Sequence, residues 1–371
     1  MLEISSAPAM RSAGCWVDRS KTKRSPLGPN VEPKPSQPTK PPQSPRVQST
    51  SNLPDYAPLQ YDTFGRYQDP GMRFEPSGVA ALRTSNRFLV VNDKSDAAQF
   101  SIYELGADGM LREQRSFDVT QNGTSVVEKL EDCTASHKEP GTYWAITSFT
   151  GDRASPKRKL VRLQINADTT LGQWQDMPIA DPRDIVRELV GETYAKVEGL
   201  ALTPSEERLL VGVRAFGPSQ TSRRYGVLLL AYSTRDLTQR PQVIAHLDLK
   251  PLLGRSEGIS GIEYSAKLGG YLILTSYEDD DQPGLQSHGV GGHLWFVRDL
   301  ARLDHIDEWR KLPRIRLEHK PEGVTLAPDG RIVVVYDDDH RKSTDGRPGT
   351  FKLLPHEAAY SLISVDQLQV P

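Results

Sequence analysis

Acidic residues recur along this chain within a short repeated phrase. The phrase and its variants read Glu75-Pro-Ser-Gly-Val-Ala, Glu131-Asp-Cys-Thr-Ala, Glu198-Gly-Leu-Ala-Leu, Ser260-Gly-Ile-Glu263-Tyr and Glu322-Gly-Val-Thr-Leu. Carboxylates are ligands that Ca²⁺ and Mg²⁺ prefer, and they also serve as acids and bases in hydrolysis. Either chemistry requires that the fold bring these acids together.

The spacing of the phrase indicates which fold does so. Successive phrases begin about 56, 67, 62 and 62 residues apart, which is the size of a structural repeat. A turn and an apolar run follow each phrase, as at residues 88–92 and 209–213, and two further runs, such as 159–163 and 174–179, complete the unit. Four strands per repeat are typical of a β-propeller blade. We therefore predict an all-β fold, a β-propeller of five four-stranded blades, with six blades as the alternative.

The two ends of the repeated region are predicted to meet. The fifth unit lacks a fourth strand because the chain ends at Pro371, and residues 59–68, which precede the first unit, can supply it. Such pairing would close the ring and leave no open sheet edge. Each unit is also longer than a bare blade of about 40–45 residues. The insertions whose pattern indicates helices are residues 182–194 and 298–309.

Residues 1–55 differ in composition from the rest of the chain. They are rich in Pro, Ser, Lys and Gln and contain few apolar residues, which predicts a disordered tail or tether before a propeller domain at 56–371. Ser12-Ala-Gly-Cys15 resembles the end of a bacterial lipoprotein signal, although no apolar stretch precedes it. Chance similarity, export as a periplasmic or lipid-anchored protein, and a cytoplasmic location therefore all stay open.

Charge and hydropathy exclude some classes of partner. The formal net charge is −2 and the isoelectric point is about 6.5, which gives no strong attraction to nucleic acid. The sequence contains no run of about 18 apolar residues, so we expect no transmembrane segment. Cys15 and Cys133 can form one disulfide at most. The expected partner is a small-molecule ester or phosphate rather than nucleic acid.

Propeller geometry places the repeated acids at one mouth of the central channel. The innermost strand of each blade lines the channel, and the loop that leads into it opens on the same face as the loop that leaves the second strand. Residues from both places are therefore expected to converge. The predicted metal ligands are Glu75, Asp93, Glu131, Glu322 and Asp338, and the predicted catalytic residues are Glu198, Arg214 and Arg153. Glu263 comes later in its strand and is expected to point elsewhere.

A ring of carboxylates cannot stay ionised without compensating positive charge, because like charges raise one another's pKa. Bound Ca²⁺, with Mg²⁺ as the alternative, would supply that charge, and Arg153 and Arg214 would supply part of it. A structural interpretation stays open beside this one. Each Glu could instead accept hydrogen bonds from backbone N–H groups and join neighbouring blades without a catalytic role.

Two of the phrases resemble those of a known group of proteins. Val197-Glu198-Gly-Leu-Ala201 and Pro321-Glu322-Gly-Val-Thr325, each followed by a strand that ends in Arg or Asp, resemble bacterial phytase-like ("esterase-like activity of phytase") propellers and related propeller families of unknown function. The resemblance spans about residues 72–366 and implies hydrolysis of phosphate or carboxylic esters, in some members with Ca²⁺. The matching positions are Glu75, Asp93, Glu198, Arg214, Glu322 and Asp338. The chain departs from the pattern at Glu131-Asp132-Cys133, where Cys replaces the Gly, and at Ser260-Gly261, where no acid precedes the Gly.

Two functions follow as hypotheses. The first is a metal-assisted hydrolase of phosphate or carboxylic esters, in which ring acids hold Ca²⁺ and Arg153 or Arg214 holds the anionic substrate. The second is a non-catalytic propeller that binds a small ligand or a protein at the same mouth and is tethered by the Pro-rich tail.

Overall fold

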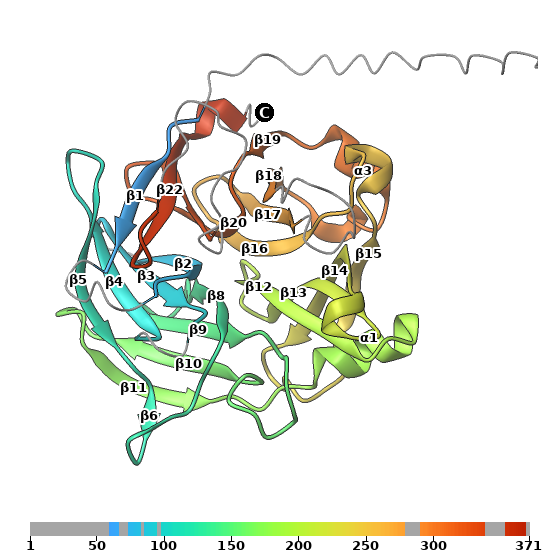
Figure 1. Ribbon diagram of the computed structural model, residues 1–371, viewed down its shortest axis with the longest axis horizontal. Helices are drawn as coiled ribbons and strands as arrows, with labels where there is room; N and C mark the ends of the chain where they lie inside the picture. Colours follow the sequence, from blue (N-terminus) through green and yellow to red (C-terminus); the bar gives the residue numbers. More distant parts are fainter. Residues whose placement is uncertain are drawn as a thin grey trace, which may run out of the picture. The chain divides into compact units, whose positions relative to one another are not determined.

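The computed structural model describes residues 59–66, 73–82, 85–94, 98–278, 290–337 and 353–368. These residues form five four-stranded antiparallel sheets arranged as the blades of a ring (Figure 1). The predicted five-bladed, all-β propeller is therefore confirmed. The tail predicted at residues 1–55 lies outside the described residues, and the domain boundary after it stays a prediction. Among the described helices, none is long and apolar enough to cross a membrane.

The strands of the first four blades follow one another in sequence order from the channel outward. Blade 1 contains β2 (Pro76–Leu82), β3 (Arg87–Asn92), β4 (Phe100–Leu105) and β5 (Leu111–Phe117). Blade 2 contains β8 (Leu130–Ala135), β9 (Thr142–Thr147), β10 (Leu160–Ile165) and β11 (Leu171–Asp176). Blade 3 contains β12 (Tyr194–Leu202), β13 (Arg208–Gly217), β14 (Arg224–Ser233) and β15 (Gln242–Leu247). Blade 4 contains β16 (Gly258–Ser265), β17 (Gly270–Glu278), β18 (Val290–Val297) and β19 (Arg314–Leu317).

Blade 5 joins the two ends of the repeated region. It contains β20 (Pro321–Leu326), β21 (Arg331–Tyr336) and β22 (Glu357–Ser364), with β1 (Asp62–Gly65) as its outermost strand. β1 pairs antiparallel with β22, from Asp62 opposite Tyr360 to Gly65 opposite Glu357. The closing strand predicted within residues 59–68 is therefore confirmed, and it covers the outer edge of β22.

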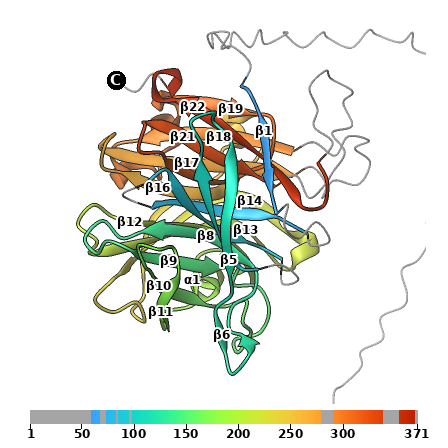
Figure 2. The same ribbon diagram turned by 90° about the vertical axis from the view of Figure 1, so that its left-hand side faces the viewer.

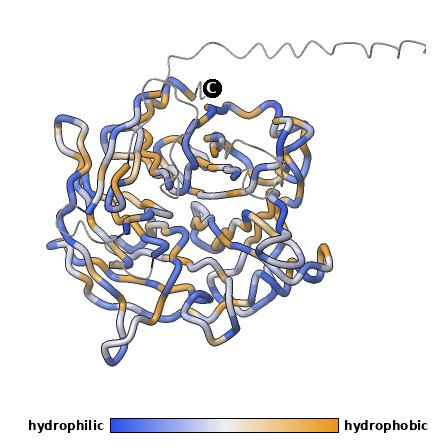
Figure 3. The backbone as a smooth tube through the Cα atoms, viewed as in Figure 1, coloured by the Kyte–Doolittle hydropathy of each residue, from blue (hydrophilic) through white to orange (hydrophobic). Residues whose placement is uncertain are grey.

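The innermost strands β2, β8, β12, β16 and β20 contact one another in this order, and β20 contacts β2, which completes the ring. Hydrophobic and hydrophilic stretches both occur around the ring (Figure 3), and strands such as β14 and β21 are apolar runs that are buried along most of their length. The apolar side chains of facing sheets fill each interface between blades, as Ile146 and Val211 do between blades 2 and 3 and Leu229 and Ile273 do between blades 3 and 4. Removal of this apolar surface from water holds neighbouring blades together and fixes the position of the channel.

The connections between strands carry short helices and a ribbon. The helices are α1 (Pro182–Val190), α2 (Lys250–Leu253) and α3 (Ile306–Lys311), with 3₁₀ turns at Gln220–Ser222, Leu300–Arg302 and Val365–Leu368. The ribbon of β6 (Thr120–Gln121) and β7 (Thr124–Ser125) projects from the ring (Figure 2). The helix predicted at 182–194 is confirmed over Pro182–Val190 as α1, whereas the segment predicted as a helix at 298–309 contains a 3₁₀ turn and the first residues of the short helix α3. Asp181 caps α1 by accepting from the N–H of Arg183, and Gly191 ends it with φ 73°.

Candidate functional site

Each innermost strand contains a β-bulge at the same point of the repeat. In β12, Val197 pairs with Val213 and Gly199 pairs with Gly212, so Glu198 is left out of the pairing. The residues at the equivalent bulged positions are Ser77, Glu131, Ser260 and Glu322. A bulge turns a side chain out of the regular alternation of a strand. Three of the five blades therefore present a carboxylate at this level of the channel, and two present a hydroxyl.

The positions of the bulges change how the first two phrases align with the other three. Similarity in letters matches Glu75 with Glu198, but the register places Ser77 at the position of Glu198 and Glu75 two residues earlier. In β8 the residue after the bulge is Asp132, so Asp132 rather than Cys133 replaces the glycine. The departures from the repeat therefore lie in blade 1 as well as in blades 2 and 4.

Asp132 links blades 2, 3 and 4 through backbone hydrogen bonds. Its Oδ1 accepts from the N–H of Cys133 at 2.8 Å, and its Oδ2 accepts from the N–H groups of Leu200 at 2.7 Å and Ile262 at 3.4 Å. A Cβ on Gly78 would lie 2.6 Å from Asp132 Cα, so blade 1 also comes close and requires glycine here. Burial raises the pKa of Asp132 well above its usual range, despite these hydrogen bonds. Of the acids considered for a blade-joining role, Asp132 has the contacts that such a role requires.

A lysine stands two positions before each bulged glutamate. The three pairs are Lys129 with Glu131, Lys196 with Glu198 and Lys320 with Glu322. Lys196 Nζ forms an ion pair with Glu198 and lies 3.4 Å from Glu131 Oε2. Lys320 Nζ lies 2.7 Å from Glu322 Oε1. The repeated acid is thus half of a longer Lys-x-Glu motif, and the recurrence of that motif could have revealed the lysines, which were not among the predicted site residues.

Arg214 connects three carboxylates at the centre of the charged network. Its Nη1 lies 2.8 and 2.7 Å from the two carboxylate oxygens of Glu198 and 3.6 Å from Glu322 Oε1. Its Nη2 lies 2.7 Å from Glu278 Oε1, and its guanidinium lies 5.2 Å from the ring centroid of Tyr225. Burial by itself lowers the pKa of Arg214, but the surrounding carboxylates outweigh burial and raise that pKa well above its usual range. Arg214 therefore stays charged although it is buried.

Residues at the ends of second strands join the same network. Glu278, the last residue of β17, lies 2.9 Å from Lys320 Nζ in addition to its contact with Arg214. Asp337, which follows β21, has its Oδ2 3.6 Å from Lys320 Nζ. The starts of first strands and the ends of second strands thus meet at one mouth of the channel, as propeller geometry requires.

Blade 1 contributes two further carboxylates, each beside a base. Glu75 is fully buried, with Oε1 2.6 Å from Arg73 Nε and Oε2 2.6 Å from Lys94 Nζ. Asp93 Oδ1 lies 3.2 Å from Lys129 Nζ. Burial raises the pKa of Asp93, but the nearby lysines outweigh burial and leave that pKa below its usual value. Asp93 is therefore ionised at neutral pH.

The carboxylates of the network fall into two electrostatic classes. Burial is the largest influence on all four of the acids compared here, and by itself it raises their pKa values. For Glu198 and Glu278, the charges of Arg214 and of neighbouring lysines outweigh burial and lower the pKa. For Glu131 and Glu322, burial prevails and the pKa is well above its usual range. Glu131 Oε1 is buried and accepts no hydrogen bond from a described residue, which fits a carboxyl that favours its neutral form.

A cavity of about 430 Å³, the mouth cavity, borders this network. Of its described lining residues, seven are cationic, namely Lys94, Lys129, Lys157, Lys196, Arg214, Arg223 and Lys320. Two are acidic, namely Asp93 and Glu278. The bulged glutamates are buried and lie outside this lining, behind the cations that pair with them. The mouth cavity therefore presents a cationic surface, although the network behind it is rich in carboxylates.

The structure brings together most of the predicted site residues. Those in or directly behind the mouth cavity are Glu75, Asp93, Glu131, Glu198, Arg214 and Glu322. Arg153 differs from the prediction, because its side chain is 75% exposed and its Nη2 lies 3.0 Å from Asp184 Oδ2, at the rim of another cavity. Asp338 lies outside the described residues. The catalytic and metal-binding roles assigned to these residues stay predictions.

The described carboxylates do not form the ligand set that Ca²⁺ requires. Ca²⁺ takes about six to eight oxygen ligands. Within the described parts of the chain, no group of three or more His, Cys, Asp or Glu residues is arranged to hold a metal ion. Glu75, Glu131 and Glu322 instead lie beside lysine or arginine nitrogens. Ca²⁺ or Mg²⁺ at the mouth therefore stays an untested prediction.

Similarity to known proteins is confined to solved structures, because no protein-family model and no curated protein sequence matches the chain. The periplasmic gluconolactonase of Pseudomonas aeruginosa is 12% identical over 78% of this chain and 88% of its own, with a TM-score of 0.40. A gluconolactonase from Xanthomonas campestris is 13% identical over 78% and 87%, with a TM-score of 0.35. An exo-1,5-α-L-arabinanase from a bovine ruminal metagenomic library is 9% identical over 82% and 94%, with a TM-score of 0.46. Similarity at this level is limited to the fold, and the phytase-like resemblance stays a prediction.

Proposed function

We propose that the mouth cavity binds a small molecule that carries a phosphate or carboxylate group, and that the protein is a hydrolase of phosphate or carboxylic esters. The observation that supports this proposal is the excess of seven cationic over two acidic side chains in the lining. Its volume of about 430 Å³ is in the range of small-molecule sites. The resemblance to phytase-like propellers points to the same class of substrate.

The described cations of the lining differ in how tightly they hold carboxylates. Arg214 and Lys320 are almost fully buried and hold carboxylates at 2.7 Å, and Lys94 and Lys196 form similarly close pairs. Lys129 and Lys157 have longer and more exposed ion pairs, at 3.2 Å and 3.9 Å from their acidic partners. A longer and more exposed ion pair is weaker and exchanges more readily for another anion. We assign binding of the anionic ligand to Lys129 and Lys157.

Hydrolysis of an ester places negative charge on a phosphoryl or carbonyl oxygen in the transition state. Cations held in place before the reaction stabilise that charge without reorganisation. Of the two lining carboxylates, Glu278 contacts both Arg214 and Lys320 within 3 Å, whereas Asp93 has its contact with Lys129 at 3.2 Å. Asp93 is therefore the better acceptor for a proton from an attacking water, and we assign it that role.

A second candidate function is binding without turnover. The observation that favours it is the composition of the described lining, which contains no serine, cysteine or histidine to act as a nucleophile or as a conventional base. The same excess of cations would bind an anion in either case. Turnover therefore distinguishes the two candidates, and binding does not.

The test measures binding of inorganic phosphate by titration calorimetry and turnover of p-nitrophenyl phosphate and p-nitrophenyl acetate. The double substitution Lys129→Gln, Lys157→Gln is expected to weaken phosphate binding about tenfold or more, since two charge-assisted hydrogen bonds are lost. The matched control is Arg224→Gln, because Arg224 lies outside the mouth-cavity lining and pairs with Glu192. Asp93→Asn is expected to abolish turnover while phosphate still binds.

Three outcomes are informative. Binding and turnover that respond as stated support the hydrolase. Binding that responds, without turnover of either ester, supports the binding propeller. Wild-type protein that shows no saturable phosphate binding contradicts both candidates.

A further inference from the structure

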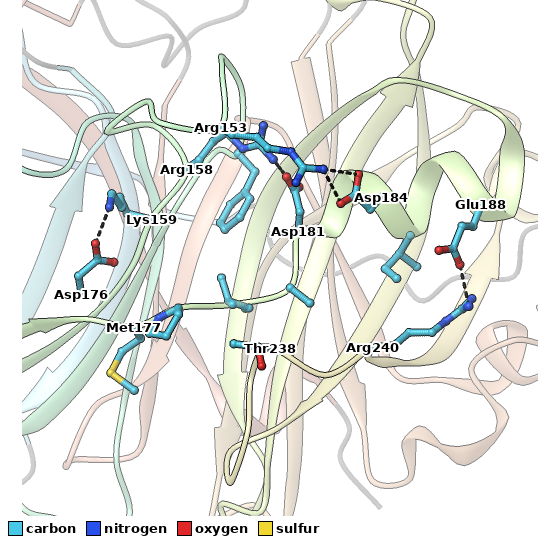
Figure 4. A pocket seen from close by; sticks show the side chains of 15 residues that line it. Arg153, Arg158, Lys159, Asp176, Met177, Asp181, Asp184, Glu188, Thr238 and Arg240 are labelled. Carbon is cyan, nitrogen blue, oxygen red and sulfur yellow. Dashed lines mark hydrogen bonds and ion pairs between the residues drawn. The ribbon is translucent and has the colours of Figure 1, made fainter. Parts of the chain in front are cut away.

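A second cavity, the outer cavity, lies between the outer strands of blade 2 and helix α1 and has a volume of about 750 Å³ (Figure 4). It is lined by residues that follow β9 and β11, by α1, and by Thr238 and Arg240 before β15. None of its described lining residues also lines the mouth cavity. The two cavities are therefore distinct places on the propeller.

One side of the outer cavity is apolar. The apolar lining residues are Phe149, Met177, Pro178, Ile179, Ala180 and Ile185. Phe149 and Ile185 belong to the cluster between blades 2 and 3, and Met177, Ile179 and Ala180 pack against it. The backbone N–H of Ala180 donates to the carbonyl of Leu237 at 2.9 Å, which fixes this segment after β11 ends at Asp176. The cavity thus has an ordered apolar floor of the kind that small-molecule sites use.

The charges around the floor balance one another. Four basic and four acidic side chains line the cavity, and Figure 4 shows them in pairs. Arg153 Nη2 lies 3.0 Å from Asp184 Oδ2, and Arg240 Nη1 lies 2.7 Å from Glu188 Oε2. Lys159 pairs with Asp176 in the same way. A neutral lining does not favour a ligand with several negative charges, in contrast to the mouth cavity.

Arg158 is the exception among these charged residues, because it is buried. Its side chain is 4% exposed and forms an ion pair with Asp181, the residue that caps α1. Its Nη1 is buried and donates no hydrogen bond to a described residue. A buried guanidinium N–H without an acceptor is costly, so an acceptor oxygen that reached it would be stabilised, once the side chains that cover this atom had shifted. The outer cavity therefore has one buried donor beneath its lining, next to an apolar floor.

We propose that the outer cavity binds a small amphipathic monocarboxylate. The apolar ring or chain of the ligand lies on the floor formed by Met177, Ile179 and Ala180, and its carboxylate accepts a hydrogen bond from Arg158 Nη1. The described lining is balanced in charge, so it neither attracts nor repels a single carboxylate, and the preference for an acid over a neutral ligand comes from Arg158 alone. The proposal is independent of the function proposed for the mouth cavity, because the two linings share no described residue.

The test measures binding of 4-phenylbutyrate to the full chain by titration calorimetry and by ligand-observed NMR. Ala180→Trp places an indole on the floor and is expected to abolish binding. Its matched control is Ala167→Trp, because Ala167 lies in an exposed turn outside the outer-cavity lining. The neutral analogue 4-phenyl-1-butanol is expected to bind about tenfold more weakly than 4-phenylbutyrate, since an alcohol is a weaker acceptor than a carboxylate.

A paired substitution tests Arg158 without leaving a buried charge alone. Arg158→Gln, Asp181→Asn replaces the pair by neutral groups, and Asn still caps a helix. This variant is expected to lose about tenfold in affinity for 4-phenylbutyrate and to lose the preference for the acid over the alcohol. The matched control is Arg153→Gln, Asp184→Asn, which removes an exposed pair at the rim and is expected to change affinity less than about twofold.

These experiments distinguish a loss of binding at the outer cavity from a loss of binding at the mouth cavity. Inorganic phosphate binding should be unchanged in Ala180→Trp, so loss of 4-phenylbutyrate binding alone identifies the outer cavity. The proposal is overturned if wild-type protein shows no saturable 4-phenylbutyrate binding, or if Ala180→Trp binds it as the wild type does. Equal binding of acid and alcohol would likewise overturn the role of Arg158.

Discussion

The mouth cavity and the outer cavity are both lined by charged side chains, but the charges are arranged differently. Among the described residues that line the outer cavity, four bases lie beside four acids around an apolar floor, and most of the pairs lie at the exposed rim. Among the described residues that line the mouth cavity, seven are basic and two are acidic, and other carboxylates are buried behind the bases. The outer cavity is therefore neutral and partly apolar, whereas the mouth cavity is cationic and polar.

The burial of the acid, rather than the number of charges, explains this difference. At the mouth, Lys196 is 20% exposed and its partner Glu198 is fully buried, so the positive end of the pair faces the cavity. At the outer rim, Arg153 is 75% exposed and Asp184 is 38% exposed, so both ends meet water and screening weakens their field. A β-bulge that turns a glutamate inward thus leaves the cationic end of an ion pair facing the cavity without changing the net charge of the chain.

The largest expected effect is the loss of Arg214. Arg214→Ala leaves Glu198, Glu278 and Glu322 buried close together without the cation that separates them. Removal of one partner from a buried ion pair typically costs about 3–5 kcal/mol of unfolding free energy. The outer-rim substitution Arg153→Ala is expected to cause no measurable loss, because exposed pairs contribute little. Urea unfolding of both variants measures the contrast, and a loss below about 1 kcal/mol for Arg214→Ala would contradict the central position of this residue.

The pH dependence of stability separates the two classes of carboxylate. The pKa of Glu131 is raised above its usual value of 4.5, so the folded protein binds this proton more tightly than the unfolded chain does. The contribution of Glu131 to stability is therefore full below pH 4.5 and declines as pH rises through the folded pKa. Glu131→Gln removes this decline, and the stability of the variant relative to wild type should rise from pH 5 to pH 8, by at most about 1.4 kcal/mol per pH unit.

Glu278→Gln is the control for this pH prediction, because the pKa of Glu278 is lowered rather than raised. The stability contributed by Glu278 is present above pH 4.5 and is lost only as pH falls through the folded pKa. The stability of Glu278→Gln relative to wild type should therefore be constant between pH 5 and pH 8. Chemical unfolding at both pH values measures the two variants, and parallel behaviour would show that the acids do not form two classes.

Salt should affect ligand binding at the two cavities unequally. Mobile ions screen the field of the exposed parts of the mouth lining, so a rise in ionic strength from about 50 to 500 mM should weaken phosphate binding about tenfold. Binding of 4-phenylbutyrate at the neutral outer cavity should change less than about twofold. Calorimetric titrations at both salt concentrations provide the measurement. A similar salt response for both ligands would remove the electrostatic difference between the cavities.

Much of the fold could be predicted because the repeat appears directly in the sequence. The apolar runs predicted the strands of the blades. The lack of a fourth strand in the last unit predicted that an earlier segment closes the ring, and β1 is that segment. The site could be predicted in part. Glu198 and Glu322 meet at the mouth because the repeat places them at equivalent bulges of innermost strands, and Arg214 reaches both from within the neighbouring strand β13. Lys196 and Lys320 could have been found from the Lys-x-Glu recurrence.

Some positions of site residues depend on backbone geometry that the amino-acid sequence does not reveal. The letters align Glu75 with Glu198, but cross-strand pairing places the bulge of blade 1 at Ser77. Gly78 is compatible with both alignments, so the sequence alone did not distinguish them. Arg153 leaves the mouth because the chain after β9 turns at Phe149, whose φ is 57°. Residues 174–179 were predicted as a strand, but β11 ends at Asp176 and the remainder forms the floor of the outer cavity.

The smallest expected effect concerns Ca²⁺, and it tests whether the mouth needs a metal at all. A ligand that binds the folded state raises its stability by RT ln(1 + [L]/Kd), so a tight site must raise the melting temperature. The described carboxylates are compensated by Lys94, Lys196, Arg214 and Lys320, and an added cation would have to displace these partners. We therefore expect EDTA followed by millimolar Ca²⁺ or Mg²⁺ to change the melting temperature by less than about 1 °C. A rise of several degrees that disappears in Glu322→Gln would instead place a cation among the ring acids, and the mouth would then bind its anionic ligand through that metal as well as through lysine and arginine.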